Sequence, residues 1–307
     1  MNLEFTGRDI ISMQDFSREE LDFLLSKAKT MEHVAETGSE LLKGKIMASL
    51  FFEPSTRTRL SFESSMLRLG GGVIGFAEPS VSSVVKGETL HDTIKTVENY
   101  SDVIVIRHPS NDAAAVAAKA AQIPVINAGS GSGEHPTQTL LDLYTLKMAK
   151  GKIDGLQIAL VGDLLYGRTV HSLAYALVNY DVKLYFVSPD ALKMKKEVIN
   201  NVEGKLQFEE TRDLNSVLSR IDVLYVTRIQ KERFANQAEY EMVKDAYVID
   251  RALLEKGKKD LIVMHPLPRV NEISTDVDET SQAWYFRQMR SGIYTRMALL
   301  ALVFGKI

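Results

Sequence analysis

Four arginines of the chain stand shortly after apolar runs that are typical of buried strands. They are Arg57, Arg107, Arg168 and Arg228. A guanidinium group presents paired N–H donors that match phosphate and carboxylate oxygens. Ligands of parallel sheets bind beyond the carboxyl ends of the strands. We therefore expect a small polyanionic substrate set, with phosphate bound in one half of the chain and carboxylates in the other.

The first of these arginines belongs to the sequence Glu-Pro-Ser-Thr-Arg-Thr-Arg at 53–59, which we call the anion turn. Ser55, Thr56 and Thr58 supply hydroxyl groups around Arg57, at the start of a predicted helix. Free N–H groups and the helix dipole attract an anion at such a place. A solvated arginine beside an ordinary hydroxyl cap is the alternative. Three hydroxyls and two arginines within five residues favour phosphate binding.

A histidine and a glutamine follow the glycine-rich run at 129–133. His135 precedes a proline at the start of a predicted helix, and Gln138 comes three residues later, so that both lie on one helix face. A lone histidine at such a place is more often a structural cap. Because other strand ends lie nearby, the interpretation of His135 as a functional residue facing a cleft is favoured.

The second half of the chain contains two more polar turns. The sequence at 162–169, Gly-Asp-Leu-Leu-Tyr-Gly-Arg-Thr, has the spacing of a P-loop, but Arg168 replaces the lysine that serves the β- and γ-phosphates. We interpret it as an anion-binding turn and reject a nucleoside triphosphatase. At 265–269, two prolines in His-Pro-Leu-Pro-Arg fix the backbone and leave carbonyl groups free as acceptors. The polar segment 82–88 reads as a flexible surface loop.

Alternating apolar strands and helices must position these residues. Strands are predicted at 46–52, 73–76, 103–107, 124–127, 157–162, 182–187, 223–227, 247–249 and 261–264. Helices are predicted from Ser17 onward and at 56–69, 90–100, 112–121, 137–150, 169–179, 191–202 and 293–303. This alternation is typical of parallel sheets covered on both faces. The expected fold class is α/β, with two doubly wound parallel-sheet domains joined by helices.

The composition excludes several classes of protein. A chain of 307 residues fits two domains, and a net charge of −3 gives no overall field that favours nucleic acid or a membrane surface. The absence of cysteine excludes disulfides and thiolate metal sites. No metal-ligand spacing is found among the six histidines, so we expect no metal and no cofactor. With no signal peptide and no apolar run long enough to span a bilayer, a cytoplasmic protein is expected.

Several motifs together resemble the aspartate/ornithine carbamoyltransferase family, nearly from end to end. In the first half these are the anion turn, Arg-His-Pro at 107–109 and His-Pro-Thr-Gln at 135–138. In the second half, the sequences at 162–172, 227–233 and 265–269 are similar to the aspartate branch. The ornithine branch has an S-M-G loop and an H-C-L-P motif, and this sequence has neither.

The resemblance implies a reaction and a domain plan. The reaction would transfer the carbamoyl group of carbamoyl phosphate to L-aspartate, giving N-carbamoyl-L-aspartate and phosphate, an early step of pyrimidine biosynthesis. Residues 1–134, completed by a C-terminal helix at 289–307, would form a carbamoyl-phosphate-binding domain. Residues 135–288 would form an aspartate-binding domain.

The resemblance also assigns roles to single residues. Phosphate would be bound by Ser55, Thr56, Arg57, Thr58 and Arg107. Thr58, Arg107 and His135 would polarise the carbamoyl oxygen. The carbamoyl NH2 would be held by Gln138 and by backbone carbonyls near Pro266 and Leu267. The aspartate carboxylates would be held by Arg168, Arg228 and Gln230.

By the family pattern, Ser82 and Lys86 would reach the site of a neighbouring subunit, and Lys86 would contact both substrates. A homotrimer with shared active sites is therefore expected, with a regulatory chain as a further possible partner. Two alternatives remain open: a carbamoyltransferase with a different amino-acid acceptor, and a non-catalytic two-lobed ligand-binding protein.

Overall fold

The computed structural model describes residues 3–231, 234 and 236–307. The chain divides into two compact units, one made of Met1–Tyr144 and Arg290–Ile307 and the other of Thr145–Met289. The sequence placed this boundary at Glu134, whereas the first unit extends into helix α5 (Pro136–Lys150). Each unit contains its own parallel sheet, as the expected α/β class requires.

The first unit has a four-stranded sheet in the order β2-β1-β3-β4, in which every neighbouring pair is parallel. Its strands are β1 (Ile46–Phe51), β2 (Gly72–Phe76), β3 (Val103–His108) and β4 (Val125–Ser130). Its helices are α1 (Arg18–Thr37), α2 (Arg57–Arg68), α3 (Leu90–Val97), α4 (Ala113–Ala120) and the later part of α11 (Tyr285–Val303). Short 3-10 turns are η1 (Met13–Asp15), η2 (Pro79–Val81) and η3 (Ser83–Lys86).

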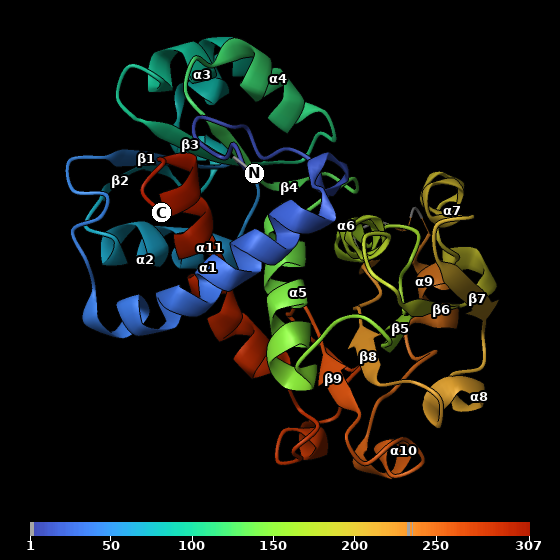
Figure 1. The fold of residues 1–307 in the computed structure, drawn as a ribbon. Helices are drawn as coiled ribbons and strands as arrows, with labels where there is room; N and C mark the ends of the chain where they lie inside the picture. The colour runs from blue at the N-terminus through green and yellow to red at the C-terminus, as the bar shows by residue number, and fades with distance from the viewer. Residues whose placement is uncertain (1–2, 232–233, 235) are drawn as a thin grey trace. The chain divides into compact units, whose positions relative to one another are not determined.

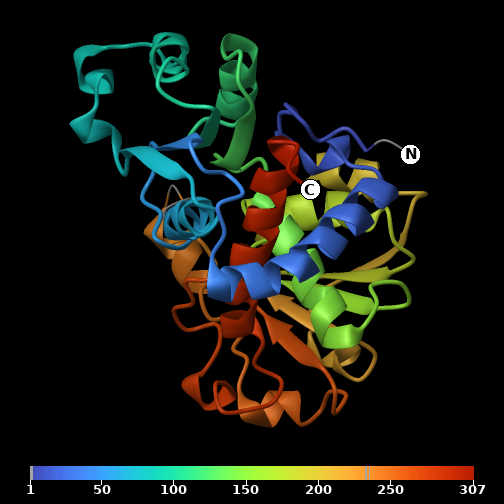
Figure 2. The same ribbon diagram turned by 60° about the vertical axis from the view of Figure 1, so that its left-hand side comes forward.

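Helices cover both faces of this sheet. Ile94 of α3 and Ala117 of α4 pack in one cluster with Leu50 of β1. Because side chains alternate along a strand, Met47 and Phe51 point to the opposite face. Both views show α3 and α4 on one side of the sheet and α1 and α2 on the other (Figures 1 and 2). The strand ends are therefore left open between the two helical layers.

Helix α1 begins where the sequence predicts. The hydroxyl of Ser17 accepts from the backbone N–H of Glu20, and the Glu20 carboxylate accepts from the N–H of Ser17. This capping box satisfies two helix-terminal donors. The buried side chains of the helix then recur at helical spacing, namely Leu21, Leu24, Leu25, Ala28, Met31 and Ala35.

The second unit has a five-stranded parallel sheet in the order β7-β6-β5-β8-β9. Its strands are β5 (Gln157–Val161), β6 (Lys183–Val187), β7 (Gln207–Thr211), β8 (Val223–Val226) and β9 (Ile262–Met264). Its helices are α6 (Arg168–Leu177), α7 (Lys196–Val202), α8 (Asn215–Leu218), α9 (Gln237–Val243) and α10 (Arg251–Leu254), with 3-10 turns η4 (Asp190–Leu192) and η6 (Thr275–Val277).

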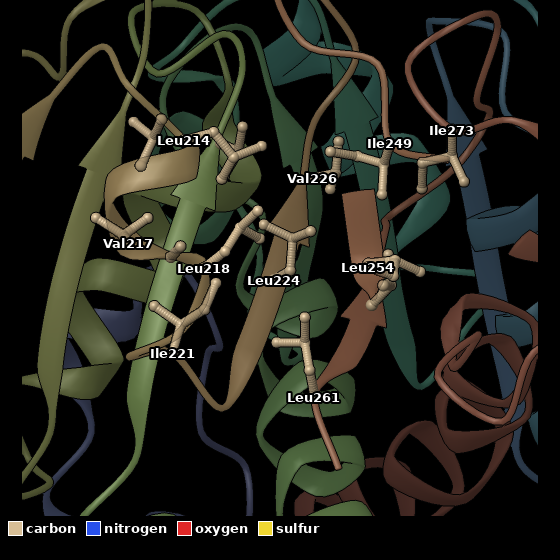
Figure 3. Close-up of a cluster of buried hydrophobic side chains, with 14 of the residues drawn as sticks. Leu214, Val217, Leu218, Ile221, Leu224, Val226, Ile249, Leu254, Leu261 and Ile273 are labelled. Carbon is tan, nitrogen blue, oxygen red and sulfur yellow. The ribbon is translucent and has the colours of Figure 1, made fainter. Parts of the chain in front are cut away.

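One buried cluster of the second unit lies on one face of this sheet. Leu224 and Val226 of β8 pack against Val217 and Leu218 of α8, and Leu254 of α10 closes the cluster (Figure 3). Branched and unbranched aliphatic side chains fill the layer, as expected for a buried parallel sheet. The strands are thereby held firmly at the edge where the second set of polar turns begins.

The structure differs from the predicted elements at four places. Residues 247–249 form no strand, because Ile249 makes only an isolated bridge with Ile273. The helix predicted at 191–202 is split into η4 and α7 by extended backbone at Lys193 and Lys195. Strand β7 was not predicted, and α11 begins at Tyr285 rather than Ile293. Among the described residues, no helix combines the length and hydropathy needed to cross a membrane.

Candidate active site

The anion turn leads from β1 into the first turn of α2. Thr58 is buried, with 6% of its surface exposed, whereas Arg57 is exposed. Thr56 occupies the N-cap position, but its side chain makes no capping hydrogen bond. The hydroxyl cap of the alternative interpretation is therefore absent, whereas Arg57 is exposed as that interpretation expects. The turn joins a helix N-terminus, hydroxyl groups and a guanidinium group, a combination that favours an anion.

Arg107 stands at the end of the neighbouring strand β3 and joins the anion turn through two contacts. Its Nε lies 3.2 Å from Oε2 of Glu53, and its Nη1 lies 3.4 Å from the hydroxyl of Ser55. Burial lowers the pKa of Arg107; Glu53 opposes this shift and the nearby Arg57 adds to it. Arg57 and Arg107 thus lie near each other at this edge of the sheet, and their positive charges favour an anionic ligand.

His135 reaches the same turn from the start of α5. Its Nε2 lies 3.3 Å from the hydroxyl of Thr58, and both side chains are buried. Gln138 follows on α5, with 5% of its surface exposed, and its backbone N–H donates to the carbonyl of His135. The structure thus brings together Ser55, Thr58, Arg107 and His135, which the sequence predicted to act together.

The loop before His135 is fixed by contacts that sequence reasoning missed. The Glu134 carboxylate accepts from the hydroxyl of Ser12 and from the backbone N–H of Met13. Gly131 has a φ of +47°, and a side chain there would place its Cβ 2.7 Å from the carbonyl of Pro109. The Glu134 contacts tie the N-terminal segment to the loop after β4, and the backbone N–H of Gly131, which donates to the carbonyl of His108 at 2.9 Å, joins the ends of β3 and β4. In the sequence, the only hint of this role is that the acidic residue Glu134 stands directly before His135, the candidate catalytic histidine.

Ser82 and Lys86 lie in a separate segment of the first unit. The Ser82 hydroxyl donates to the carbonyl of Pro79 and accepts from the N–H of Val84, and Lys86 is exposed at the end of η3. The predicted flexible loop is therefore a pair of 3-10 turns. These contacts belong to the segment itself and do not join Ser82 or Lys86 to the anion turn.

The second unit carries its own set of polar groups at the ends of β5 and β8. Asp163 is completely buried, and its carboxylate accepts from the backbone N–H of Tyr166 at 2.9 Å. Its own N–H donates to the hydroxyl of Thr227 at 3.0 Å. Gln230 then donates from Nε2 to the carbonyl of Tyr166 at 3.2 Å. Asp163, another residue whose role the sequence reasoning missed, ties the two strand ends together.

Gly162 makes this close approach possible. Its φ is +115°, and a Cβ there would lie 2.3 Å from the carbonyl oxygen of Thr227. The turn places Arg168 in the first turn of α6, and Arg228 follows Thr227 at the end of β8. Both arginines are half-buried. Glu232 and Arg233, which end the motif at 227–233, lie outside the described residues.

The 265–269 segment has an unusual backbone held by a buried histidine. Leu267 has a φ of +55°, and the Leu267–Pro268 peptide is cis. The Nδ1 of His265 accepts from the backbone N–H of Leu267 at 2.7 Å, and its Nε2 lies 2.7 Å from the Glu272 carboxylate. Since Nδ1 accepts, Nε2 carries the proton and His265 is neutral. His265 therefore fixes the position of Leu267, whose backbone carbonyl is the second predicted acceptor of this segment.

Glu272 is a buried carboxylate with several donors. Burial alone would raise its pKa. The hydrogen bonds from His265 and from the backbone N–H of Val270 together outweigh burial, so the pKa of Glu272 is lowered. Within the part of the chain that the structure describes, no three histidine or acidic side chains are grouped so that they could hold a metal ion.

The two sets of residues suit different chemistry. In the first unit, cationic and hydroxyl donors surround a helix N-terminus, with a buried histidine beside them, which suits an oxyanion and a polarised oxygen. In the second unit, two arginines and a glutamine stand at strand ends, which suits carboxylates.

Comparison with known proteins finds a family model for each half of the chain. The family model for the aspartate/ornithine carbamoyltransferase carbamoyl-P binding domain matches residues 8–148. The model for the Asp/Orn binding domain of these enzymes matches residues 154–303. The chain is 58% identical over 306 residues to the aspartate carbamoyltransferase catalytic subunit of Thermococcus kodakarensis, and 99% of each chain is covered.

Solved structures agree. The aspartate transcarbamoylase of Trypanosoma cruzi in complex with carbamoyl aspartate and phosphate superposes with a TM-score of 0.93 at 46% identity, over 97% of both chains. The catalytic subunit of the M. jannaschii aspartate transcarbamoylase gives a TM-score of 0.90 at 52% identity, over 97% of this chain and 98% of the other.

Proposed function

The chain belongs to the aspartate/ornithine carbamoyltransferase family, and we propose that it transfers the carbamoyl group of carbamoyl phosphate to the amine of L-aspartate. The products are N-carbamoyl-L-aspartate and phosphate. One observation of the site carries the proposal: the anion turn is joined to a buried His135 through Thr58 and to Arg107 through Ser55. Phosphate donors and a donor for the carbonyl oxygen therefore stand side by side.

The first unit binds carbamoyl phosphate. Ser55, Thr56, Arg57 and Thr58 bind its phosphate from the N-terminus of α2. Arg107, held at its Nε by Glu53, reaches phosphate and carbonyl oxygen. Gln138 accepts from the carbamoyl NH2, and the backbone carbonyls of Pro266 and Leu267, which belong to the second unit, are assigned the same role. As functional domains, residues 1–134 with 289–307 bind carbamoyl phosphate and residues 135–288 bind aspartate, while His135 and Gln138 at the start of the second range act on carbamoyl phosphate.

The second unit binds the acceptor. Arg168, Arg228 and Gln230 hold the two carboxylates of aspartate, and the buried Asp163 keeps the backbone of Gln230 in place with an N–H to Oδ2 distance of 3.5 Å. A dicarboxylate is favoured over a monocarboxylate acceptor because two guanidinium groups serve this turn.

The reaction needs positioning and charge stabilisation. The neutral amine of aspartate attacks the carbamoyl carbon, and negative charge grows on the carbonyl oxygen. Thr58, Arg107 and His135 donate to that oxygen, an effect that typically lowers the barrier by about 3–4 kcal/mol per donor. The bond from carbon to the phosphate oxygen then breaks, and the departing phosphate takes the proton that the amine loses.

The first experiment measures ureido product from carbamoyl phosphate with L-aspartate, with L-ornithine and without an acceptor, using the purified chain. Product with aspartate alone supports the proposal. Product with another amino acid keeps the family and overturns the assignment of Arg228 and Gln230. A folded chain that binds phosphate but gives no product with any acceptor favours a two-lobed binding protein.

We further propose a homotrimer in which Ser82 and Lys86 complete the site of a neighbouring subunit. Exposed apolar side chains support self-association of this region. They are Leu60 and Leu67 of α2, Ile74 of β2, Val81 and Val85. Mixing inactive Lys86→Ala chains with inactive Arg57→Ala chains should restore part of the activity, because some sites then combine two intact halves. Proven subunit exchange without recovery contradicts shared sites.

A regulatory partner and a cytoplasmic location complete the proposal. The relatives above carry the name catalytic subunit, which supports a search for a second chain by co-purification. Fractionation of cells between membrane and cytosol tests the location.

A further inference from the structure

Gln138 makes a hydrogen bond that decides which end of its amide remains for a ligand. Its Nε2 lies 2.9 Å from Oδ1 of Asp142, one helical turn further along α5. An ionised carboxylate accepts hydrogen bonds and donates none, so Gln138 must direct its NH2 group to Asp142. The carbonyl oxygen Oε1 of Gln138 then lies at the other end of the amide and serves a different partner.

Asp142 is completely buried, and a buried cation stands near it. Arg296 of α11 has 3% of its surface exposed and is attracted electrostatically to Asp142. Burial lowers the pKa of Arg296 to about 10, and Asp142 opposes this shift. The guanidinium group therefore keeps its charge at neutral pH and supplies the countercharge for an ionised Asp142.

The surroundings of Arg296 fix its place in the first unit. Its Nη1 lies 2.8 Å from the hydroxyl of Ser61, and its guanidinium lies 5.0 Å from the centre of the Phe62 ring. A side chain at Gly292 would place its Cβ 2.5 Å from the same Nη1. Glycine at 292 thus leaves the space that the guanidinium occupies between α2, α5 and α11.

A buried ion pair contributes little to stability compared with well-packed apolar groups, because desolvation offsets the attraction. The function that we assign to the pair of Asp142 and Arg296 is to orient the amide of Gln138. A carbamoyl NH2 is a hydrogen-bond donor and needs an acceptor opposite it. If the amide of Gln138 were turned around, two NH2 groups would face each other.

We propose that Asp142 is a positioning residue that holds the Gln138 amide so that its Oε1 accepts from the NH2 group of carbamoyl phosphate. The inference rests on the proposed function, because Gln138 is assigned to the carbamoyl NH2 there. Asp142 acts through Gln138 and touches no substrate itself. Its effect is selectivity for a carbamoyl group over an acyl group of the same shape.

A pair of stable ligands tests this selectivity without catalysis. Phosphonoacetamide has an NH2 group on its carbonyl, and acetonylphosphonate has a methyl group at the same place. Calorimetric titration of both ligands gives the ratio of their dissociation constants. We expect the wild type to prefer the amide by about tenfold or more, since a site built to bind a donor rejects an analogue without it.

Three variants separate positioning from structure. Asp142→Asn allows either orientation of Gln138, so the preference for phosphonoacetamide should fall to about twofold while acetonylphosphonate binds as before. Asp142→Glu keeps the carboxylate and should retain most of the preference. Ser61→Ala removes a hydrogen bond of Arg296 without touching Gln138 and is the matched control, with the preference unchanged.

Asp142→Asn leaves Arg296 buried without a countercharge, so the double variant Asp142→Asn with Arg296→Met is measured beside it. Both should lose the preference if they fold. A folded Asp142→Asn or double variant that keeps the wild-type preference overturns the proposal, as does an equal loss in Ser61→Ala. Turnover is measured separately: a wild type that prefers the amide but forms no carbamoyl-aspartate contradicts the proposed function and leaves the assignment of Asp142 supported.

Discussion

Replacing Gly162 with alanine should cost more free energy of unfolding than replacing another glycine of positive φ in the same unit. Gly162 has a φ of +115°, which strains any L residue by about 1–3 kcal/mol. The new Cβ would also lie 2.3 Å from the Thr227 carbonyl and 2.8 Å from its hydroxyl. Relief of that overlap must move backbone, which costs a further ~1–3 kcal/mol. Gly151, with a φ of +78° and nothing within 4 Å of its Cβ, is the control.

The assay is urea unfolding of Gly162→Ala and Gly151→Ala at one protein concentration, together with steady-state kinetics. Gly151→Ala should lose about 1–2 kcal/mol from backbone strain alone, and its KM for aspartate should not change. Gly162→Ala should lose clearly more, and its KM for aspartate should rise by about tenfold because Thr227 carries Arg228 with it. Equal losses of stability would refute the steric reasoning. An unchanged KM at the larger loss would refute the link from Gly162 to the acceptor site.

Three other outcomes follow from the contacts described above. Glu53→Gln removes the carboxylate beside Arg107, so Arg107 should bind added phosphate more strongly and phosphate should raise the Tm of this variant more than that of the wild type. An equal rise would contradict the idea that Glu53 competes with phosphate for Arg107. The pKa of Glu272 is lower in the folded chain than in the unfolded chain. Its ionised carboxylate therefore stabilises the fold above the unfolded pKa of about 4.3, and this stabilisation is lost as the pH falls through the folded pKa. The stability gap between wild type and Glu272→Gln, which weakens the His265 contact, should therefore shrink below about pH 4 in urea titrations, and a constant gap contradicts it. Arg228→Lys keeps the charge but loses the paired donors, so the KM for aspartate should rise by about tenfold with little change for carbamoyl phosphate.

The sequence predicts best the strands that are apolar and buried on both faces of their sheet. β1, β5 and β8 are buried along almost their whole length, and their apolar runs were sufficient to find them. Strand β7 contains glutamine and glutamates at a sheet edge, so its hydrogen bonds to β6 form without an apolar pattern.

The prediction of one helix at 191–202 is wrong for a different reason. Leu192 and Met194 are both buried two residues apart, whereas Val198 and Val202 are buried four apart. The first spacing is that of an extended chain and the second that of a helix. When the whole segment is treated as one helix, the two spacings are averaged, and the extended backbone at Lys193 and Lys195 is missed.

At the site, the residues proposed to bind a ligand are easier to find from the sequence than the residues that hold them in place. Arginines and a histidine after strands stand out by type and place. Glu53, Glu134 and Asp163 are carboxylates in polar turns, where such residues are common. Their importance comes from partners far away in the sequence, such as Ser12 for Glu134. Only the folded chain brings those partners together.

The two sheets also differ at the outer strands β7 and β2, and this difference affects how readily each edge could pair with a strand of another chain. At β7, Glu209 pairs with Arg220 at 3.1 Å and Lys183 at 3.7 Å, which gives that edge charge against stacking with another chain. At β2, the outer strand of the other described sheet, the sequence is Gly-Val-Ile-Gly-Phe, and Ile74 is 40% exposed. The edge at β2 therefore has less charge to oppose pairing with another chain than the edge at β7. In the homotrimer proposed above, dilution below the dissociation constant should leave the β2 edge of each separated chain open to such pairing.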